Sequence, residues 1–305
     1  MITTLRLAVI TALLFWAAHV GAAPSQVYVS APDGVKVAVQ EYGNPKGLEI
    51  VLVHGLDGSH LDWMKQTSSP LLSKYRLITY DLRGHGFSDK PTEASYYADG
   101  RQWGDELHAV MEAKHLKRPV LVGWSLGGPV LTNYLSIYGD SQIAGIVYVD
   151  GIIELKPELL KIHPATVAAL LSPDEAAYLE GTRQFIRQCF YHQPNPAEFS
   201  RLYAGASEAS PNMVRQAFAG LSIPAASALP KVAVPALYIY GERDDLVDSH
   251  MVTRARQLLP RLQVLTYSVT GHASFFEQPA RFNRDLDRFV QQAAEKDGVA
   301  GVDPR

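Results

Sequence analysis

The sequence contains one cysteine in 305 residues, so no disulfide can form within the chain. The fold must therefore depend on its apolar core, and a chain of this length can build one sizeable domain with an insertion. The cysteine itself, Cys189, lies between Ile186 and Phe190 on an apolar helical face, which indicates packing.

Basic residues are not concentrated on any stretch of the chain. The 28 lysines and arginines are mixed with 31 aspartates and glutamates, and the formal net charge is -3. Without a basic stripe, we expect no nucleic-acid partner. The sequence also shows no internal repeat, no low-complexity segment and no metal, nucleotide or haem motif, so we expect no metal site and no cofactor.

Charge is almost absent from the first thirty residues, where Arg6 is the only charged side chain before Asp33. An almost wholly apolar run from Leu7 to Val20 follows Arg6, and small residues follow the run. This order is typical of a secretory signal peptide, which we predict over residues 1–22, with export to the periplasm or the medium. The run is shorter than the roughly 20 residues that span a membrane, so we expect no stable membrane span after cleavage. An uncleaved anchor stays open as the alternative, and nothing in the sequence indicates the oligomeric state.

Short apolar runs alternate with amphipathic helical patterns across short loops, beginning with a pair of strands around the turn at Pro32-Asp33-Gly34. This alternation predicts an α/β protein with a mostly parallel, twisted sheet and helices on both faces. The predicted strands are residues 26–30, 35–42, 49–53, 75–80, 119–122, 143–149, 235–240 and 262–267.

The strand pattern stops between residues 153 and 229. We predict that this segment is a helical cap inserted into a core formed by residues 23–152 and 230–295, with residues 296–305 as a tail. Ser172-Pro173-Asp174-Glu175 matches a capping box and predicts a helix start, and Ser210-Pro211 predicts another. The cap would lie over the carboxyl ends of the strands, where open α/β folds bind ligands. We expect some of its apolar side chains to line a pocket, from a set that includes Leu160, Phe185, Phe190 and Phe218.

One pentapeptide, Gly123-Trp124-Ser125-Leu126-Gly127, follows a buried strand and precedes a helical pattern. Glycines on both sides of the serine suit a sharp turn from strand to helix, in which the backbone folds back closely on itself. Such a turn holds the Ser125 hydroxyl out at the carboxyl end of the strand. The context therefore predicts that Ser125 is a nucleophile.

A serine hydroxyl needs a base that takes its proton and a third group that orients the base. Asp244 follows the seventh predicted strand, and His272 follows the last one. The candidates in chain order are therefore Ser125, Asp244 and His272. Asp245, which is adjacent to Asp244, stays open as the orienting acid.

With these motifs in this order, the chain resembles the α/β-hydrolase superfamily over nearly all of its predicted mature length. Within that superfamily it is most similar to capped serine esterases and cofactor-free haloperoxidases. The blocks that carry the resemblance are Val53-His54-Gly55, Asp81-Leu82-Arg83-Gly84-His85-Gly86-Phe87-Ser88, the Ser125 turn, Gly241-Glu242-Arg243-Asp244, and Gly271-His272 with Glu277-Gln278-Pro279.

The resemblance implies roles for particular residues. The Gly-x-x-Asp spacing of the family favours Asp244 as the acid. Some members carry the acid after the preceding strand, so Asp150 stays open as an alternative. The backbone N–H groups of Leu56 and Leu126 are the expected oxyanion-hole donors, a role that does not depend on the side chain. Asp81 and Arg83 are expected to hold their loop together.

The function implied is that of a serine hydrolase that cleaves small, apolar carboxylic esters through an acyl-serine intermediate. A perhydrolase or cofactor-free haloperoxidase activity uses the same three residues, and motif inspection does not separate it from esterase activity. A non-catalytic ligand-binding homologue is a further alternative. Serine at position 125 argues against a halide or epoxide hydrolase, since such relatives use aspartate there.

Overall fold

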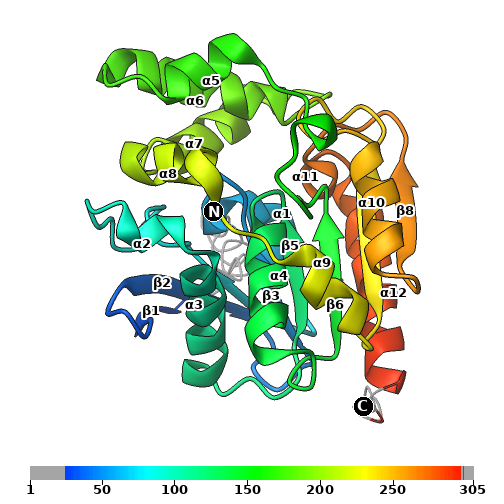
Figure 1. Cartoon of the computed structure of the whole chain (residues 1–305). Coiled ribbons are helices and arrows are strands. Elements are labelled where there is room, and N and C mark those ends of the chain that lie inside the picture. Colours follow the sequence, from blue (N-terminus) through cyan, green and yellow to red (C-terminus); the bar gives the residue numbers. More distant parts are fainter. Residues whose placement is uncertain (1–24, 297, 299–305) are drawn as a thin grey trace, which may run out of the picture.

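The computed structural model describes residues 25–296 and residue 298 (Figure 1). The predicted signal peptide and nearly all of the predicted tail lie outside the described residues. Eight strands form one sheet in the order β1-β2-β4-β3-β5-β6-β7-β8, and every pairing is parallel except β1 with β2 and β2 with β4. The strands are β1 (Ser25–Ser30), β2 (Lys36–Gly43), β3 (Glu49–Val53), β4 (Arg76–Tyr80), β5 (Val120–Trp124), β6 (Gly145–Val149), β7 (Ala236–Gly241) and β8 (Gln263–Tyr267).

The central strands are buried on both faces because their sequences are almost continuously apolar. Every residue of β5, β6 and β7 is buried. Each of the eight predicted strands is present, with ends that differ from the prediction by at most two residues. The predicted fold class is therefore confirmed.

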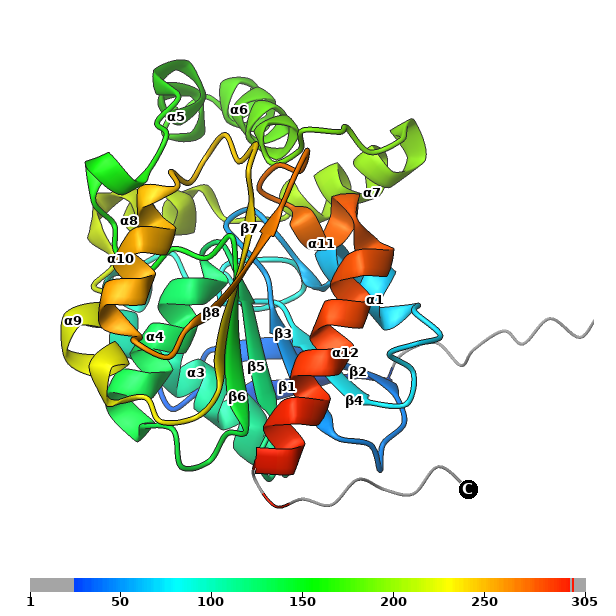
Figure 2. The same ribbon diagram turned by 90° about the vertical axis from the view of Figure 1, so that its right-hand side faces the viewer.

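Helices cover both faces of the sheet, as Figure 2 shows. Buried apolar side chains form two clusters, one beneath each layer of helices, with Trp103 and Leu131 in the first and Phe282 and Phe289 in the second. On one face lie α3 (Gly100–Ala113), α4 (Gly127–Tyr138), α9 (Ala225–Ala228) and α10 (His250–Leu258); on the other lie α1 (Met64–Thr67), α11 (Ser274–Glu277) and α12 (Pro279–Lys296). The short elements η1 (His60–Trp63) and α2 (Ser95–Ala98) belong to loops that follow β3 and β4.

Between β6 and β7 the chain forms helices that lie largely beyond one end of the sheet (Figures 1 and 2). Cys189 is buried at the end of the longest of them, as its apolar neighbours predict. Among the described residues, no helix has both the length and the apolar character needed to cross a membrane. The helices between β6 and β7 are η2 (Pro157–Leu159), α5 (Pro164–Leu170), α6 (Glu175–Gln188), α7 (Pro196–Ala206), α8 (Pro211–Gly220), α9 and η3 (Leu229–Lys231).

The start of α6 differs from the predicted capping box. Asp174, not Ser172, is the N-cap, and its Oδ1 accepts a hydrogen bond from the N–H of Ala177 at 2.8 Å. Ser172 Oγ instead accepts a hydrogen bond from the N–H of Asp174 at 3.1 Å, and this N–H precedes the first helical residue. The prediction was wrong because the carboxylate caps the free amides of the first turn and complements the helix dipole there.

The sequence prediction also missed α7, although its signal is present. Asn195 Oδ1 accepts from the N–H of Glu198 at 2.9 Å, and Glu198 Oε2 accepts from the N–H of Asn195 at 3.2 Å. Pro196 occupies the first helical position. A capping box followed by a proline therefore begins a helix that the sequence analysis did not predict.

Candidate active site

Ser125 lies in a tight turn between β5 and α4 with a backbone φ of 51°, which is unusual for a residue with a side chain. Its N–H donates to the carbonyl of Val149 at 3.1 Å, and its own carbonyl accepts from the N–H of Gly128 at 2.9 Å. A Cβ at Gly127 would lie 2.6 Å from the carbonyl oxygen of Val53, so only glycine fits there. These contacts hold Ser125 at the carboxyl end of the sheet.

His272 and Asp244 meet in the loops after β8 and β7. His272 Nδ1 lies 2.8 Å from Asp244 Oδ2, and both residues are buried, with 1% of each exposed. Asp244 Oδ1 accepts from the N–H groups of Leu246 at 2.8 Å and Val247 at 2.9 Å. The other ring nitrogen of His272, Nε2, is buried and has no hydrogen-bond partner among the described residues. Ser125 and His272 line the same cavity.

The two rival carboxylates have other partners. Asp245 is exposed, and its Oδ2 lies 3.2 Å from Nε2 of His163. Asp150 is fully buried and accepts from the N–H of Gly241 at 2.7 Å and from Ser274 Oγ at 2.9 Å. Burial, and after it the nearby negative charge of Asp244, raises the pKa of Asp150 well above its usual range. Of the three candidate acids, only Asp244 is hydrogen-bonded to His272.

Leu56 and Leu126 line the same cavity as Ser125. Within the described part of the chain, neither backbone N–H has a hydrogen-bond acceptor. The loop that carries Leu56 is held by His54, whose Nδ1 lies 2.7 Å from the carbonyl of Gly55 and whose Nε2 accepts from the N–H of Leu82 at 2.9 Å. Burial lowers the pKa of His54 to about 4, so its ring is neutral at pH 7. Leu56 and Leu126, each with an amide that is free among the described residues, therefore both belong to the cavity wall, one from a loop held by His54 and one at a helix start.

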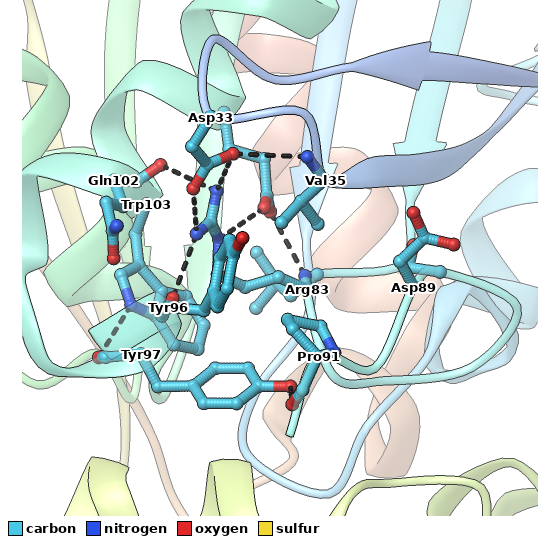
Figure 3. A network of polar contacts seen from close by, with 12 residues as sticks. Asp33, Val35, Arg83, Asp89, Pro91, Tyr96, Tyr97, Gln102 and Trp103 are labelled. Carbon is cyan, nitrogen blue, oxygen red and sulfur yellow. Dashed lines mark hydrogen bonds and ion pairs between the residues drawn. The ribbon is translucent and has the colours of Figure 1, made fainter. Parts of the chain in front are cut away.

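Arg83 joins several segments of the chain through polar contacts, as Figure 3 shows. Its Nε donates to Glu106 Oε2 at 2.8 Å, and its Nη1 donates to Asp33 Oδ2 at 2.7 Å and to the carbonyl of Tyr96 at 2.9 Å. Asp81, in the same loop, accepts from the N–H of His60 at 2.7 Å. Neither Arg83 nor Asp81 lines the cavity, and both are fully buried, so their contacts serve to hold the loop.

The carboxyl of Asp57 extends from the Leu56 loop toward the cap. It is 3% exposed, and its one hydrogen bond among the described residues, from Thr182 Oγ1 on α6, is long at 3.5 Å. Burial raises the pKa of Asp57 from 3.8 to about 7. Because the folded protein holds the proton more tightly than the unfolded chain, ionisation of Asp57 lowers the stability as pH rises from about 4 through about 7.

Asp57→Asn should remove this pH-dependent loss. We expect the free energy of unfolding to rise relative to the parent, by about 3 kcal/mol more at pH 8 than at pH 5, from 1.36 kcal/mol per pKa unit. Asparagine also tolerates the φ of 52° at this position. Denaturant unfolding at both pH values measures the effect, with Glu180→Gln on the exposed face of α6 as the control. An equal effect of Asp57→Asn at the two pH values would contradict the prediction.

A cavity of about 330 Å³ lies between the sheet and the cap, and its wall is mostly apolar. Of the cap residues expected to line a pocket, Leu160 and Phe185 do so. Phe190 does not, because it packs against Phe276 with ring centroids 5.5 Å apart. The side chain of Phe218 lies outside the described residues. Among the described residues, sequence reasoning missed five polar ones that also line the cavity: Lys156, Lys161, His163, Thr166 and Gln188.

The family model of the alpha/beta hydrolase fold matches residues 50–279. This range includes Ser125, Asp244 and His272 together with the cap, and the chain belongs to the α/β-hydrolase family.

Its relatives include both esterases and haloperoxidases. A proposed aryl esterase from Burkholderia cenocepacia has a solved structure that is 51% identical, with a TM-score of 0.87, covering 89% of this chain and 100% of its own. A non-heme chloroperoxidase from Burkholderia pyrrocinia is 28% identical over 87% of this chain and 99% of its own length. A bifunctional esterase/perhydrolase from Acinetobacter calcoaceticus is 26% identical over 87% of this chain and 99% of its own.

Proposed function

We propose that this protein is a serine hydrolase that cleaves carboxylic esters, with Ser125 as nucleophile, His272 as base and Asp244 as orienting acid. The observation that carries the proposal is that His272 lines the same cavity as Ser125, with its Nδ1 hydrogen-bonded to Asp244 and its Nε2 without a partner among the described residues. The esterases among the relatives support the reaction class.

In this mechanism, His272 Nε2 takes the proton of Ser125 as Oγ attacks the acyl carbon. The oxyanion that forms accepts hydrogen bonds from the N–H groups of Leu56 and Leu126, which have no other acceptor among the described residues. Protonated His272 then gives its proton to the leaving alcohol. Water, activated by the same ring, attacks the acyl-serine and releases the acid, and Asp244 stabilises the imidazolium in both steps.

Covalent labelling with a fluorophosphonate tests the nucleophile directly. We expect one equivalent to be incorporated, with the adduct mapped by mass spectrometry to the peptide that contains Ser125. Prior incubation with an ester substrate should slow the labelling. Incorporation at another residue, or none in the folded protein, would contradict the proposal.

Perhydrolysis is the second candidate, since the relative from Acinetobacter calcoaceticus is named for both activities. In that reaction hydrogen peroxide replaces water as the group that attacks the acyl-serine, and a peracid is released. Peracid formation from acetate and hydrogen peroxide, compared with ester hydrolysis by the same preparation, distinguishes the two.

We propose that the protein acts in the periplasm or outside the cell after residues 1–22 are removed, since these residues have the pattern of a signal peptide. Fractionation of expressing cells and N-terminal sequencing of the mature protein test this. A cytoplasmic protein with its first 22 residues intact would contradict it.

We propose that the cap sets the length of substrate that fits. Each methylene placed against an apolar wall contributes about 0.8 kcal/mol, so kcat/KM should rise with acyl length and fall once the cavity is full. Phe185→Ala, which enlarges the cavity at α6, should move the optimum to longer chains by one or two carbons. Assays with 4-nitrophenyl esters from acetate to decanoate measure this shift.

The control for this experiment is Leu179→Ala, on the same helix and half-buried but not in the cavity wall. It should leave the optimum unchanged. If Phe185→Ala shifts the profile no more than Leu179→Ala does, the cap does not set the length preference.

A further inference from the structure

Two lysines, Lys156 and Lys161, line the cavity, and no aspartate or glutamate is among the described residues that do so. Apart from these lysines and the histidines His163 and His272, no ionisable group belongs to the wall in the part of the chain that the structure describes. When charges of one sign line a cavity with apolar walls, the walls focus the electrostatic field of those charges into the cavity. The cavity therefore favours a negative group over a positive one.

The two lysines differ in how their charge is compensated. Lys156 Nζ lies 2.8 Å from Glu154 Oε2, and that carboxylate also pairs with Arg254, whose Nη2 is 2.8 Å from Oε1. The charge of Lys156 is thus compensated in part by Glu154, a side chain outside the cavity wall. Any preference for an anion must come mainly from the other lysine.

Lys161 Nζ donates to the main-chain carbonyl of Asp244 at 2.5 Å, and no carboxylate among the described residues forms an ion pair with it. An ammonium has three donors, so further hydrogen bonds are open to it. The nearby Asp248 has its own partner, His250. The pKa of Asp248 is lowered mainly by the backbone N–H of His250, and Lys161 is the least of the causes.

The backbone around Lys161 is tied to the loop that carries Asp244. Leu160 pairs with Val247 as an isolated antiparallel bridge, and the N–H of Lys161 donates to the carbonyl of Leu246 at 2.9 Å. Together with the bond from Nζ, these contacts fix the lysine at both ends. A cation that is already ordered costs less conformational entropy when a ligand binds.

We propose that Lys161 is a specificity-determining residue that selects esters carrying an anionic group, such as a second carboxylate, in the part of the substrate that occupies the cavity. The inference rests on the proposed ester-hydrolase function and names its substrate class. The apolar wall takes the carbon chain, and the ammonium of Lys161 pairs with the anion.

Matched substrate pairs test the proposal, with the anion on either side of the ester. The acyl pair is the mono-4-nitrophenyl ester of adipic acid and 4-nitrophenyl hexanoate; the alcohol pair is 4-acetoxybenzoate and its methyl ester. For each pair, the ratio of kcat/KM for the anionic over the neutral ester is compared between variants. The ratio cancels any effect that a change at Lys161 has on Asp244.

Lys161→Met should lower at least one of these ratios about tenfold or more, as expected for the loss of a charge-assisted hydrogen bond. Lys161→Arg should preserve most of the preference for the anionic ester, and added salt should lower that preference in the parent. The matched control Lys156→Met removes a compensated lysine from the same wall, and should change the ratio less than about threefold. If neither ratio responds to Lys161→Met more than to Lys156→Met, the proposal is overturned.

Binding to the Ser125→Ala protein gives a readout that needs no turnover. Calorimetry with monomethyl adipate and methyl hexanoate, and with the acetoxybenzoate pair, should show tighter binding of an anionic ester that is lost with Lys161→Met. Equal binding within both pairs would overturn the inference, even if neutral esters are hydrolysed. Absence of hydrolysis for every ester with charge-dependent binding intact would instead count against the proposed function alone.

Discussion

Replacing Ser125 by alanine should lower kcat for 4-nitrophenyl acetate by about 10⁴-fold or more, because loss of one member of such a triad disables the whole unit. The protein should stay folded. Alanine has the same difficulty as serine with a φ of 51°, and the lost hydroxyl lines a cavity and fills no space in the core. Steady-state assays and thermal unfolding of the same preparation measure both.

The control for this substitution is Ser207→Ala, a half-buried serine at the end of α7 whose hydroxyl bonds only to the carbonyl of Ala204 at 3.0 Å among the described residues. It should keep activity within about twofold of the parent. Activity of Ser125→Ala within tenfold of the parent, in protein free of contaminating esterase, would show that another residue is the nucleophile.

The sequence could predict the sheet and the meeting of distant residues because parallel strands have a simple geometry. Apolar runs of strand length alternate with helical patterns, and each predicted strand is present. Their carboxyl ends lie at one edge, so residues that follow β5, β7 and β8 are brought together whatever their separation along the chain. Ser125 and His272 line one cavity for this reason.

Which of the neighbouring aspartates contacts His272 could be decided only from the contacts in the structure. Asp244 and Asp245 are adjacent, and composition and periodicity do not say which carboxylate points inward. In the structure, Asp244 accepts from two backbone N–H groups that turn it toward His272, whereas Asp245 is exposed. Hydrogen bonds within a short loop decide this, and they follow from backbone angles that the sequence pattern does not specify.

The cap was the least predictable part. Its helix starts at Asp174 and Asn195 depend on one or two hydrogen bonds between side chains and backbone amides, and neighbouring polar residues can form similar bonds. The position of Lys161 could not be predicted at all. It depends on pairing between Leu160 and Val247, which are far apart in the chain and are not part of any regular strand.

Asp244→Asn should lower kcat on the order of 10⁴-fold with little change in the fold. The asparagine carbonyl can keep the hydrogen bonds from the N–H groups of Leu246 and Val247. Its amide then presents N–H to His272 Nδ1 in place of a carboxylate oxygen, which favours the tautomer with the proton on Nε2. In that tautomer the ring cannot accept the proton of Ser125, so the loss should appear in kcat and not in KM.

Replacement of the two rival acids, Asp245 and Asp150, by asparagine distinguishes an orienting role in catalysis from a structural role. Asp245→Asn alters an exposed side chain and should cost less than about threefold. Asp150→Asn keeps an acceptor for the N–H of Gly241 and offers its own N–H to Ser274 Oγ, as a protonated Asp150 would offer its hydroxyl. Since the raised pKa of Asp150 favours its protonated form, this near-isosteric change should cost far less than Asp244→Asn. If Asp150→Asn is instead the most damaging of the three, the orienting acid lies after β6, and the contact between His272 and Asp244 does not serve catalysis.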